Sequence, residues 1–103
     1  MKKASIIFRF SNRSKQRERN LRIILDYLKP LQHIEIIVVA MELDIDVPKF
    51  VNKFFIKDKF ESALANNIGA SKANTNIFIF QDADIIFNNE IYNTVIKTIN
   101  ECI

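Results

Sequence analysis

Apolar residues along the chain alternate between strand-like runs and helix-like spacing. Residues 5–10 form a short apolar run, and residues 34–40 are nearly continuous in β-branched side chains. Both runs predict buried strands, the second covered on both faces. From Ser14 to Pro30 the apolar spacing predicts a helix. Its expected inner face is Leu21, Ile24, Leu25 and Leu28. Strand, helix and strand in this order predict a right-handed crossover.

The second half of the chain continues this alternation. Residues 41–52 lack clear periodicity and predict a loop or a broken turn of helix. Residues 54–56 predict a brief edge strand and residues 76–80 a further strand, and a last helix begins at Asn89. The expected inner faces are Phe60, Ala63, Leu64, Asn67, Ile68 and Ser71 in a helix before the strand at 76–80, and Ile91, Val95, Ile99 and Cys102 in the last helix. The pattern predicts one α/β domain over residues 1–103, a three-layer sandwich with a mainly parallel sheet.

The segment FIFQDADIIF, residues 78–87, places Asp82 and Asp84 within an apolar run. Charges beside a core are costly unless they are paired or bound to a metal. On an extended segment, residues i and i+2 point to the same side. Two such carboxylates suit Mg²⁺ or Mn²⁺, which keep positions for water and for the phosphates of a ligand. The alternative is that the pair caps the strand end or accepts hydrogen bonds from nearby backbone amides.

The basic residues are concentrated near the start of the chain. The formal charge is +3, but residues 9–22 hold all five arginines and carry six basic residues against one acidic, while the remainder carries nine against eleven. Arg13 and Arg17 fall in the strand-to-helix turn and first helical turn, where backbone amides and the helix dipole favour anions. Guanidinium groups would add paired hydrogen bonds to a phosphate. For Arg19 and Arg22 we expect the alternative, a solvated helix face.

Parallel strands bring these two features together. Open α/β sheets bind ligands beyond the carboxyl ends of their strands. The arginines follow the strand at 5–10 and the aspartates follow the strand at 76–80, so both should lie at the same edge of the sheet. A local basic patch favours an anionic ligand over a general nucleic-acid surface.

Several classes of site lack the residues they need. The single glycine, Gly69, excludes the dinucleotide fingerprint and the phosphate-binding loop. No Ser-His-Asp or Cys-His set can be assembled, and His33 is expected on a surface loop. The single cysteine, Cys102, is expected in the core and cannot form an internal disulfide. Without an apolar run of about 18 residues or a signal-peptide pattern, we expect a cytoplasmic chain with no membrane span.

Four segments in this order carry a resemblance: FRFSNR and RERNL after the first strand, IEIIVV in the second, and FESALANNIGASKANTNIFIFQDAD. Together they resemble the nucleotide-sugar half of GT-A fold glycosyltransferases. The likeness is to inverting family 2 enzymes, including chondroitin-polymerase-like ones, and to the β-1,4-galactosyltransferase type. It covers nearly the whole chain.

The resemblance implies a UDP-sugar donor, an acceptor sugar or glycan, and Mn²⁺ or Mg²⁺. Asp82 would face the donor's ribose or a metal-bound water, and Asp84 would bind the metal directly. The general base comes from the following half in these families, so no catalytic residue is assigned. We therefore expect this chain to be the donor-binding half alone, with an exposed sheet edge that favours self-association.

Other family positions map onto the start of the chain. Phe10, Asn12 and Arg13 match the family pattern Phe-Arg-Asn-Arg, whereas its second position, an arginine, is a serine here; Arg9, Arg17 or Arg19 would substitute for it. Phe60 matches a position near the uracil, with core packing as the alternative. Asn67 and Gly69 would allow close helix packing, and Glu42 would be the acidic residue after the second strand.

Three alternatives remain open at this stage. A Toprim-like phosphoryl-transfer domain also has an aspartate pair after a later strand, but it needs a glutamate directly after the first strand, where Arg9 and Phe10 stand. A nucleic-acid-binding module would use the arginines on phosphates, although Asp82 and Asp84 at the same edge would repel the backbone. The third alternative is a folded, non-catalytic remnant.

Overall fold

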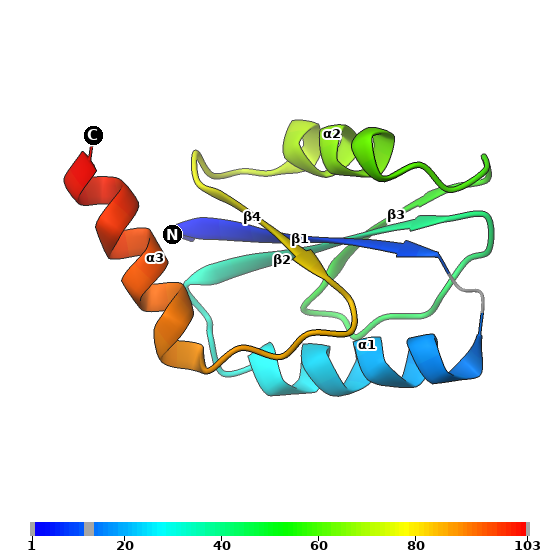
Figure 1. Ribbon diagram of the computed structural model, residues 1–103, viewed down its shortest axis with the longest axis horizontal. Helices are drawn as coiled ribbons and strands as arrows, with labels where there is room; N and C mark the ends of the chain where they lie inside the picture. The colour runs from blue at the N-terminus through cyan, green and yellow to red at the C-terminus, as the bar shows by residue number, and fades with distance from the viewer. Residues whose placement is uncertain (1, 12–13, 103) are drawn as a thin grey trace.

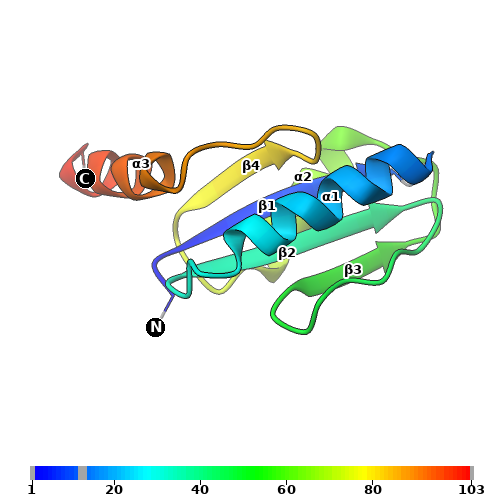
Figure 2. The same ribbon diagram turned by 90° about the horizontal axis from the view of Figure 1, so that it is seen from below.

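The computed structural model describes residues 2–11 and 14–102. Their elements are β1 (Ala4–Ser11), α1 (Lys15–Leu28), β2 (Ile34–Met41), β3 (Asn52–Ile56), α2 (Ser62–Lys72), β4 (Phe78–Asp82) and α3 (Asn89–Cys102). The four strands form one parallel sheet in the order β3-β2-β1-β4, which Figure 2 shows from the side of α1. The predicted α/β class and parallel sheet are confirmed.

Helices α1 and α2 cover opposite faces of the sheet, so the domain has three layers (Figure 1). The core on the α1 face includes Ile6, Phe8, Phe10, Leu21, Ile24, Leu25, Leu28, Ile34, Ile36, Val38 and Ala40. The smaller core on the α2 face includes Ile7, Ile37, Val39, Met41 and Ala65. Successive residues of a strand point to opposite faces. The central strands β1 and β2 are therefore apolar at nearly every position because both of their faces are covered.

Helix α1 forms as its sequence predicts. Ser14 is the N-cap, and its side chain accepts a hydrogen bond from the backbone N–H of Arg17 at 3.2 Å. This cap satisfies one of the amides that a helix leaves free at its start. The four apolar residues expected on the inner face are all buried. The helix ends two residues before Pro30, which could not continue it without losing a backbone hydrogen bond.

Helix α2 packs closely on β1 through only part of the predicted face: Leu64 and Ile68, with Phe60 before the helix, pack against the core on the α2 face. Ala63, Asn67 and Ser71 are exposed, and Ala65 and Gly69 are buried instead. A Cβ atom at Gly69 would lie 2.4 Å from Cγ2 of Ile7, so the helix fits here because glycine has no side chain. Small apolar residues surround α2 on several sides, and spacing alone does not select one face.

Helix α3 is rotated relative to its predicted orientation. Tyr92 and Ile96 are buried, whereas Ile91 and Cys102 are exposed. The predictions of a core cysteine and of Ile91 on the inner face are wrong. The hydroxyl of Tyr92 donates a hydrogen bond of 2.6 Å to Oε1 of Gln81, which is also buried. Turning this tyrosine inward fixes the helix face and leaves Ile91 on the outside.

Strand β4 lies at the edge of the sheet, beside β1. It pairs with β1 from Phe78 to Asp82, two residues later than the predicted strand at 76–80. Within residues 2–11 and 14–102, no helix combines the length and the apolar character that crossing a bilayer requires.

Candidate functional site

A cavity of about 260 Å³ lies at the carboxyl ends of β1 and β4. Its walls are Arg9, Phe10 and Ser11 of β1, Arg17 of α1, Phe60 and Ser62 at the start of α2, and Asp82, Ala83 and Asp84 at the end of β4. The chain runs outward from β1 through β2 to β3, then returns to place β4 on the other side of β1 (Figure 2). Ligands of open α/β sheets bind where the strand order reverses in this way.

The cavity brings together most of the site residues predicted from the sequence. Phe10, Arg17, Phe60, Asp82 and Asp84 come from four separate segments and line the same space. Two further predicted site residues, Asn12 and Arg13, lie outside the described residues. The expectation that basic and acidic groups share one edge of the sheet is therefore met by the described part of the site.

The charge of Asp82 is compensated by Arg9. The two residues are opposite each other in the β1–β4 register, and Nη2 of Arg9 lies 2.5 Å from Oδ1 of Asp82. The side chain of Arg9 is 25% exposed and that of Asp82 is 50% exposed. The sequence indicates that the charges of the aspartates must be balanced by pairing or by a metal. It does not identify Arg9 as the partner of Asp82, because that contact depends on β4 lying beside β1.

Asp84 does not continue the strand. The chain turns directly after Asp82, with the N–H of Ile85 3.4 Å from the carbonyl of Asp82. The premise that both carboxylates lie on one extended segment is therefore wrong, although both border the cavity. Asp84 is exposed, and within residues 2–11 and 14–102 its carboxylate has no hydrogen bond or ion pair.

The donor set suits a hydrated cation better than an enclosed one. Within the part of the chain that the structure describes, no three residues among His, Cys, Asp and Glu are grouped to hold a metal ion. The cavity offers two carboxylates, Asp82 and Asp84. Mg²⁺ is commonly held by one or two carboxylates, with water and substrate phosphates filling the other positions. The residues present fit such an ion when a phosphate ligand accompanies it.

Among the described residues that line the cavity, the positive and negative charges are equal in number. Arg9 and Arg17 supply two positive charges, and Asp82 and Asp84 supply two negative charges. A free anion would meet two carboxylates, and a free cation would meet two guanidinium groups. A phosphate group bound together with a divalent cation presents charges that both pairs can satisfy.

The two phenylalanines that line the cavity also pack in the cores of the domain. Phe10 is only 2% exposed and belongs to the core on the α1 face. Phe60 is half-buried and packs against the core on the α2 face. Its backbone N–H donates to Oε1 of Glu42 at 2.8 Å, and Glu42 has a left-handed backbone with φ of 72°. Glu42 thus fixes the approach to α2 and is not among the residues that line the cavity.

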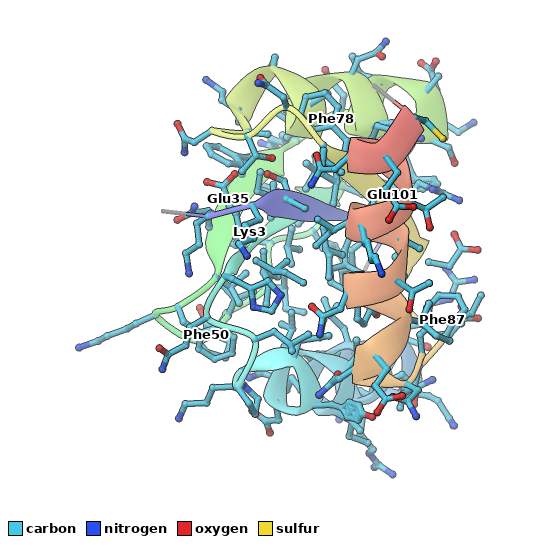
Figure 3. The ribbon with its side chains drawn as sticks, turned by 90° about the vertical axis from the view of Figure 1, so that its left-hand side faces the viewer. Lys3, Glu35, Phe50, Phe78, Phe87 and Glu101 are labelled. Carbon is cyan, nitrogen blue, oxygen red and sulfur yellow. The ribbon has the colours of Figure 1, made fainter. Side chains whose placement is uncertain are left out.

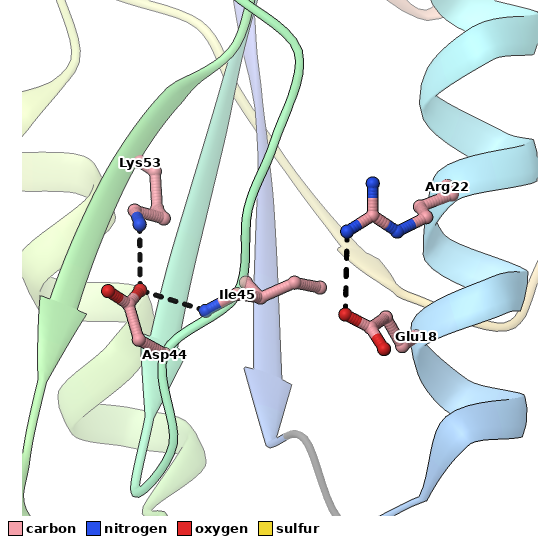
Figure 4. Close-up of polar contacts among 5 residues, drawn as sticks. All are labelled: Glu18, Arg22, Asp44, Ile45 and Lys53. Carbon is pink, nitrogen blue, oxygen red and sulfur yellow. Dashed lines mark hydrogen bonds and ion pairs between the residues drawn. The ribbon is translucent and has the colours of Figure 1, made fainter.

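Other charged residues are engaged away from the cavity (Figure 4). Arg22 lies 3.4 Å from Glu18 on the surface of α1, as expected for a solvated helix face. Asp44 accepts hydrogen bonds from Lys53 at 2.7 Å and from the N–H of Ile45 at 2.8 Å. The bond from Lys53, and then that from Ile45, lower the pKa of Asp44. These groups stabilise the surface and the loop before β3.

A second polar cluster lies at the other end of the sheet, and sequence reasoning missed it. Glu35 of β2 is 6% exposed and lies near the start of β1 in Figure 3. It accepts hydrogen bonds from Ser5 Oγ at 2.7 Å, from the N–H of Asn74 at 2.9 Å and from Nδ2 of Asn74 at 2.7 Å. The signal was an acidic residue inside an otherwise apolar strand.

The surroundings of Glu35 favour its charged form. Burial raises the pKa of its carboxyl, but the hydrogen bonds from Asn74 and Ser5 outweigh burial and lower the pKa below its ordinary value. The cluster joins β1, β2 and the segment between α2 and β4.

His33, expected on a surface loop, is half-buried, with Nε2 2.7 Å from Oδ1 of Asn93.

No protein family, curated protein or solved structure matches this chain.

Proposed function

We propose that this chain is the donor-binding domain of a metal-dependent glycosyltransferase, which binds a UDP-sugar for transfer to the hydroxyl of an acceptor sugar or glycan. The observation that carries the proposal is the charge-balanced cavity at the reversal of strand order, with Arg9 and Arg17 facing Asp82 and Asp84. This arrangement supports a diphosphate bound with a divalent cation. The sugar nucleotide comes from the sequence resemblance to GT-A fold enzymes.

The size of the cavity supports a division of the ligand. Its volume of about 260 Å³ is below the roughly 300–1,000 Å³ of sites that enclose a drug-sized ligand. The diphosphate and cation would occupy the cavity, and the base and the sugar would lie on the adjoining surface. Phe60, which precedes α2, borders the cavity and would contact the base, because Phe10, the other aromatic residue of the described lining, is buried in the core.

The residues of the cavity would act mainly by electrostatics. The guanidinium groups of Arg9 and Arg17 would bind phosphate oxygens and stabilise the charge that develops on the departing diphosphate. Asp82 and Asp84 would hold Mn²⁺ or Mg²⁺. When bound, that ion supplies Lewis-acid neutralisation of the diphosphate. The general base that activates the acceptor hydroxyl is not assigned to a residue of this chain.

Two further parts of the proposal concern the cellular location of the chain and its self-association. A single cysteine requires no oxidising compartment, so we propose a cytoplasmic location. Within residues 2–11 and 14–102, no strand pairs with the outer edge of β4, and Phe78 and Phe80 of this strand are exposed. Such an edge favours pairing with another strand, and we propose self-association there. Sedimentation velocity across a concentration series should show a dimer, and Phe80→Lys should shift it to monomer.

Calorimetric titration tests the proposed ligand. UDP should bind the wild-type chain with Mn²⁺ and bind at least about tenfold more weakly with a chelator. Asp84→Asn should remove the dependence on Mn²⁺. Asp26→Asn, a change at an exposed carboxylate on α1, is the matched control and should behave as wild type. A folded wild-type chain that binds neither UDP nor UDP-sugars in either condition would reject the proposal.

A further inference from the structure

Arg9 already occupies one of the carboxylates that would bind the cation. Its Nη2 lies 2.5 Å from Oδ1 of Asp82, and the two residues are held opposite each other by the β1–β4 register. Both side chains line the cavity. In this structure, the guanidinium that would bind a phosphate is therefore paired with the carboxylate that would bind the cation.

We propose that Arg9 couples cation binding to phosphate binding, an inference that rests on the proposed function. A cation that binds Oδ1 of Asp82 must displace the guanidinium of Arg9, and a cation at Oδ2 would meet the positive charge of that guanidinium at close range. Because β1 fixes the backbone of Arg9, the released group remains in the cavity and is free to bind a phosphate oxygen. Phosphate bound to Arg9 in turn leaves Asp82 to the cation. By linkage, each ligand raises the affinity for the other by the same factor.

Arg17 and Asp84, the other charged residues of the described part of the cavity, are not paired in this way. Within the described residues, neither the guanidinium of Arg17 nor the carboxylate of Asp84 takes part in a hydrogen bond or ion pair. Each can accept its ligand without giving up a partner. Arg9 is thus a positioning residue whose effect on the cation acts through Asp82.

Titration of three probes separates this role from simple charge attraction. The probes are Mn²⁺ alone, inorganic pyrophosphate alone, and Mn²⁺ at saturating pyrophosphate. In Arg9→Gln, Mn²⁺ alone should bind roughly three- to fivefold more tightly than in wild type, since Asp82 loses its competitor and a partly exposed ion pair is worth about that factor. The factor by which pyrophosphate raises the affinity for Mn²⁺ should fall.

Arg17→Gln is the comparison variant. It removes the same charge from the same cavity but breaks no contact with Asp82. We expect it to raise the affinity for Mn²⁺ alone by less than about twofold, because only screened long-range attraction changes. Equal effects of the two variants, or no gain in Arg9→Gln, would overturn the coupling.

A second substitution keeps the inference testable if Arg9→Gln does not fold, as judged by circular dichroism. Arg9→Lys retains the charge but loses the planar fork that suits a carboxylate. It should bind Mn²⁺ alone more tightly than wild type, and unchanged affinity would overturn the coupling. Wild-type binding of Mn²⁺ with pyrophosphate, without the differences above, leaves the proposed function standing. Failure of every probe to bind wild type would overturn both.

Discussion

Glu35 and Asp82 are both acidic residues of the sheet, but they lie in opposite kinds of surroundings. Glu35 is buried at the amino end of β2 and accepts hydrogen bonds from neutral groups, those of Ser5 and Asn74. Asp82 is half exposed at the carboxyl end of β4, and its partner is the cation Arg9. The first carboxylate is bound on several sides by fixed donors, whereas the second is bound by one flexible side chain.

This difference separates a structural charge from an exchangeable one. A buried group must keep its hydrogen bonds, because losing them costs the full penalty of an unsatisfied polar atom. A half-exposed ion pair contributes little to stability, because water can replace either partner. The end of the sheet that holds Asp82 can therefore exchange its internal contacts for a ligand, and the end that holds Glu35 cannot.

Truncation of Glu35 should give the largest loss of stability. Glu35→Ala leaves the N–H and side-chain amide of Asn74 without their acceptor and removes one of the two partners of the Ser5 hydroxyl, which also lies 2.7 Å from Thr75 Oγ1. We expect the free energy of unfolding to fall by about 2–4 kcal/mol. Urea unfolding followed by circular dichroism measures the change. Glu101→Ala, at an exposed glutamate of α3, should stay within about 0.5 kcal/mol. A similar small change in Glu35→Ala would contradict the structural role.

Acid should weaken the same cluster. Because the pKa of folded Glu35 is below its ordinary value of 4.5, its contribution to stability is complete above that pH and is lost as the pH falls toward the lower folded value. Wild type should therefore lose more stability between pH 6 and pH 3 than Glu35→Gln, which cannot titrate there. Urea midpoints measured across this range test the sign, and parallel losses in both chains would contradict it.

Removal of one donor should have a smaller effect than removal of the acceptor. Asn74→Ala deletes the side-chain hydrogen bond to Glu35 but retains the backbone N–H that also donates to it. We expect a loss of about 1–2 kcal/mol. Combined with Glu35→Ala, the two changes should be non-additive, with a coupling of about 0.5 kcal/mol or more. Additive losses in the double mutant would show that the two residues act separately.

Sequence pattern determined the fold well where one face of an element was strongly favoured. The apolar spacing of α1 and the β-branched run of β2 each allow only one arrangement. The inner face of α2 was predictable only in part. Leu64, Ile68 and the close approach at Gly69 were expected, whereas the burial of Ala65 was not, because small apolar residues lie around most of the helix. In α3, the inward stripe is Tyr92, Ile96 and Ile99, and the hydrogen bond from Tyr92 to Gln81 is a tertiary contact that apolar spacing does not show.

The location of the candidate site was predictable from the sequence, but the ion pair between Arg9 and Asp82 was not. Parallel strands bring their carboxyl ends to one edge, so Arg17, Asp82 and Asp84 could be placed together from the order of elements alone. The contact between Arg9 and Asp82 depends on strand order, which local spacing does not encode. The hydrogen-bonded cluster around Glu35 was not predicted, because its sequence neighbours are apolar and its hydrogen-bond partners are distant in the sequence.

The smallest effect on stability should come from Asp82. Asp82→Asn removes a half-exposed ion pair while keeping the size of the side chain. We expect the free energy of unfolding to change by less than about 1 kcal/mol. Urea unfolding beside Glu35→Gln, the equivalent change at the buried carboxylate, gives the matched comparison. A loss in Asp82→Asn as large as in Glu35→Gln would mean that the Arg9–Asp82 pair is structural. A small loss leaves a folded chain in which Mn²⁺ titration reports on the ligand site alone.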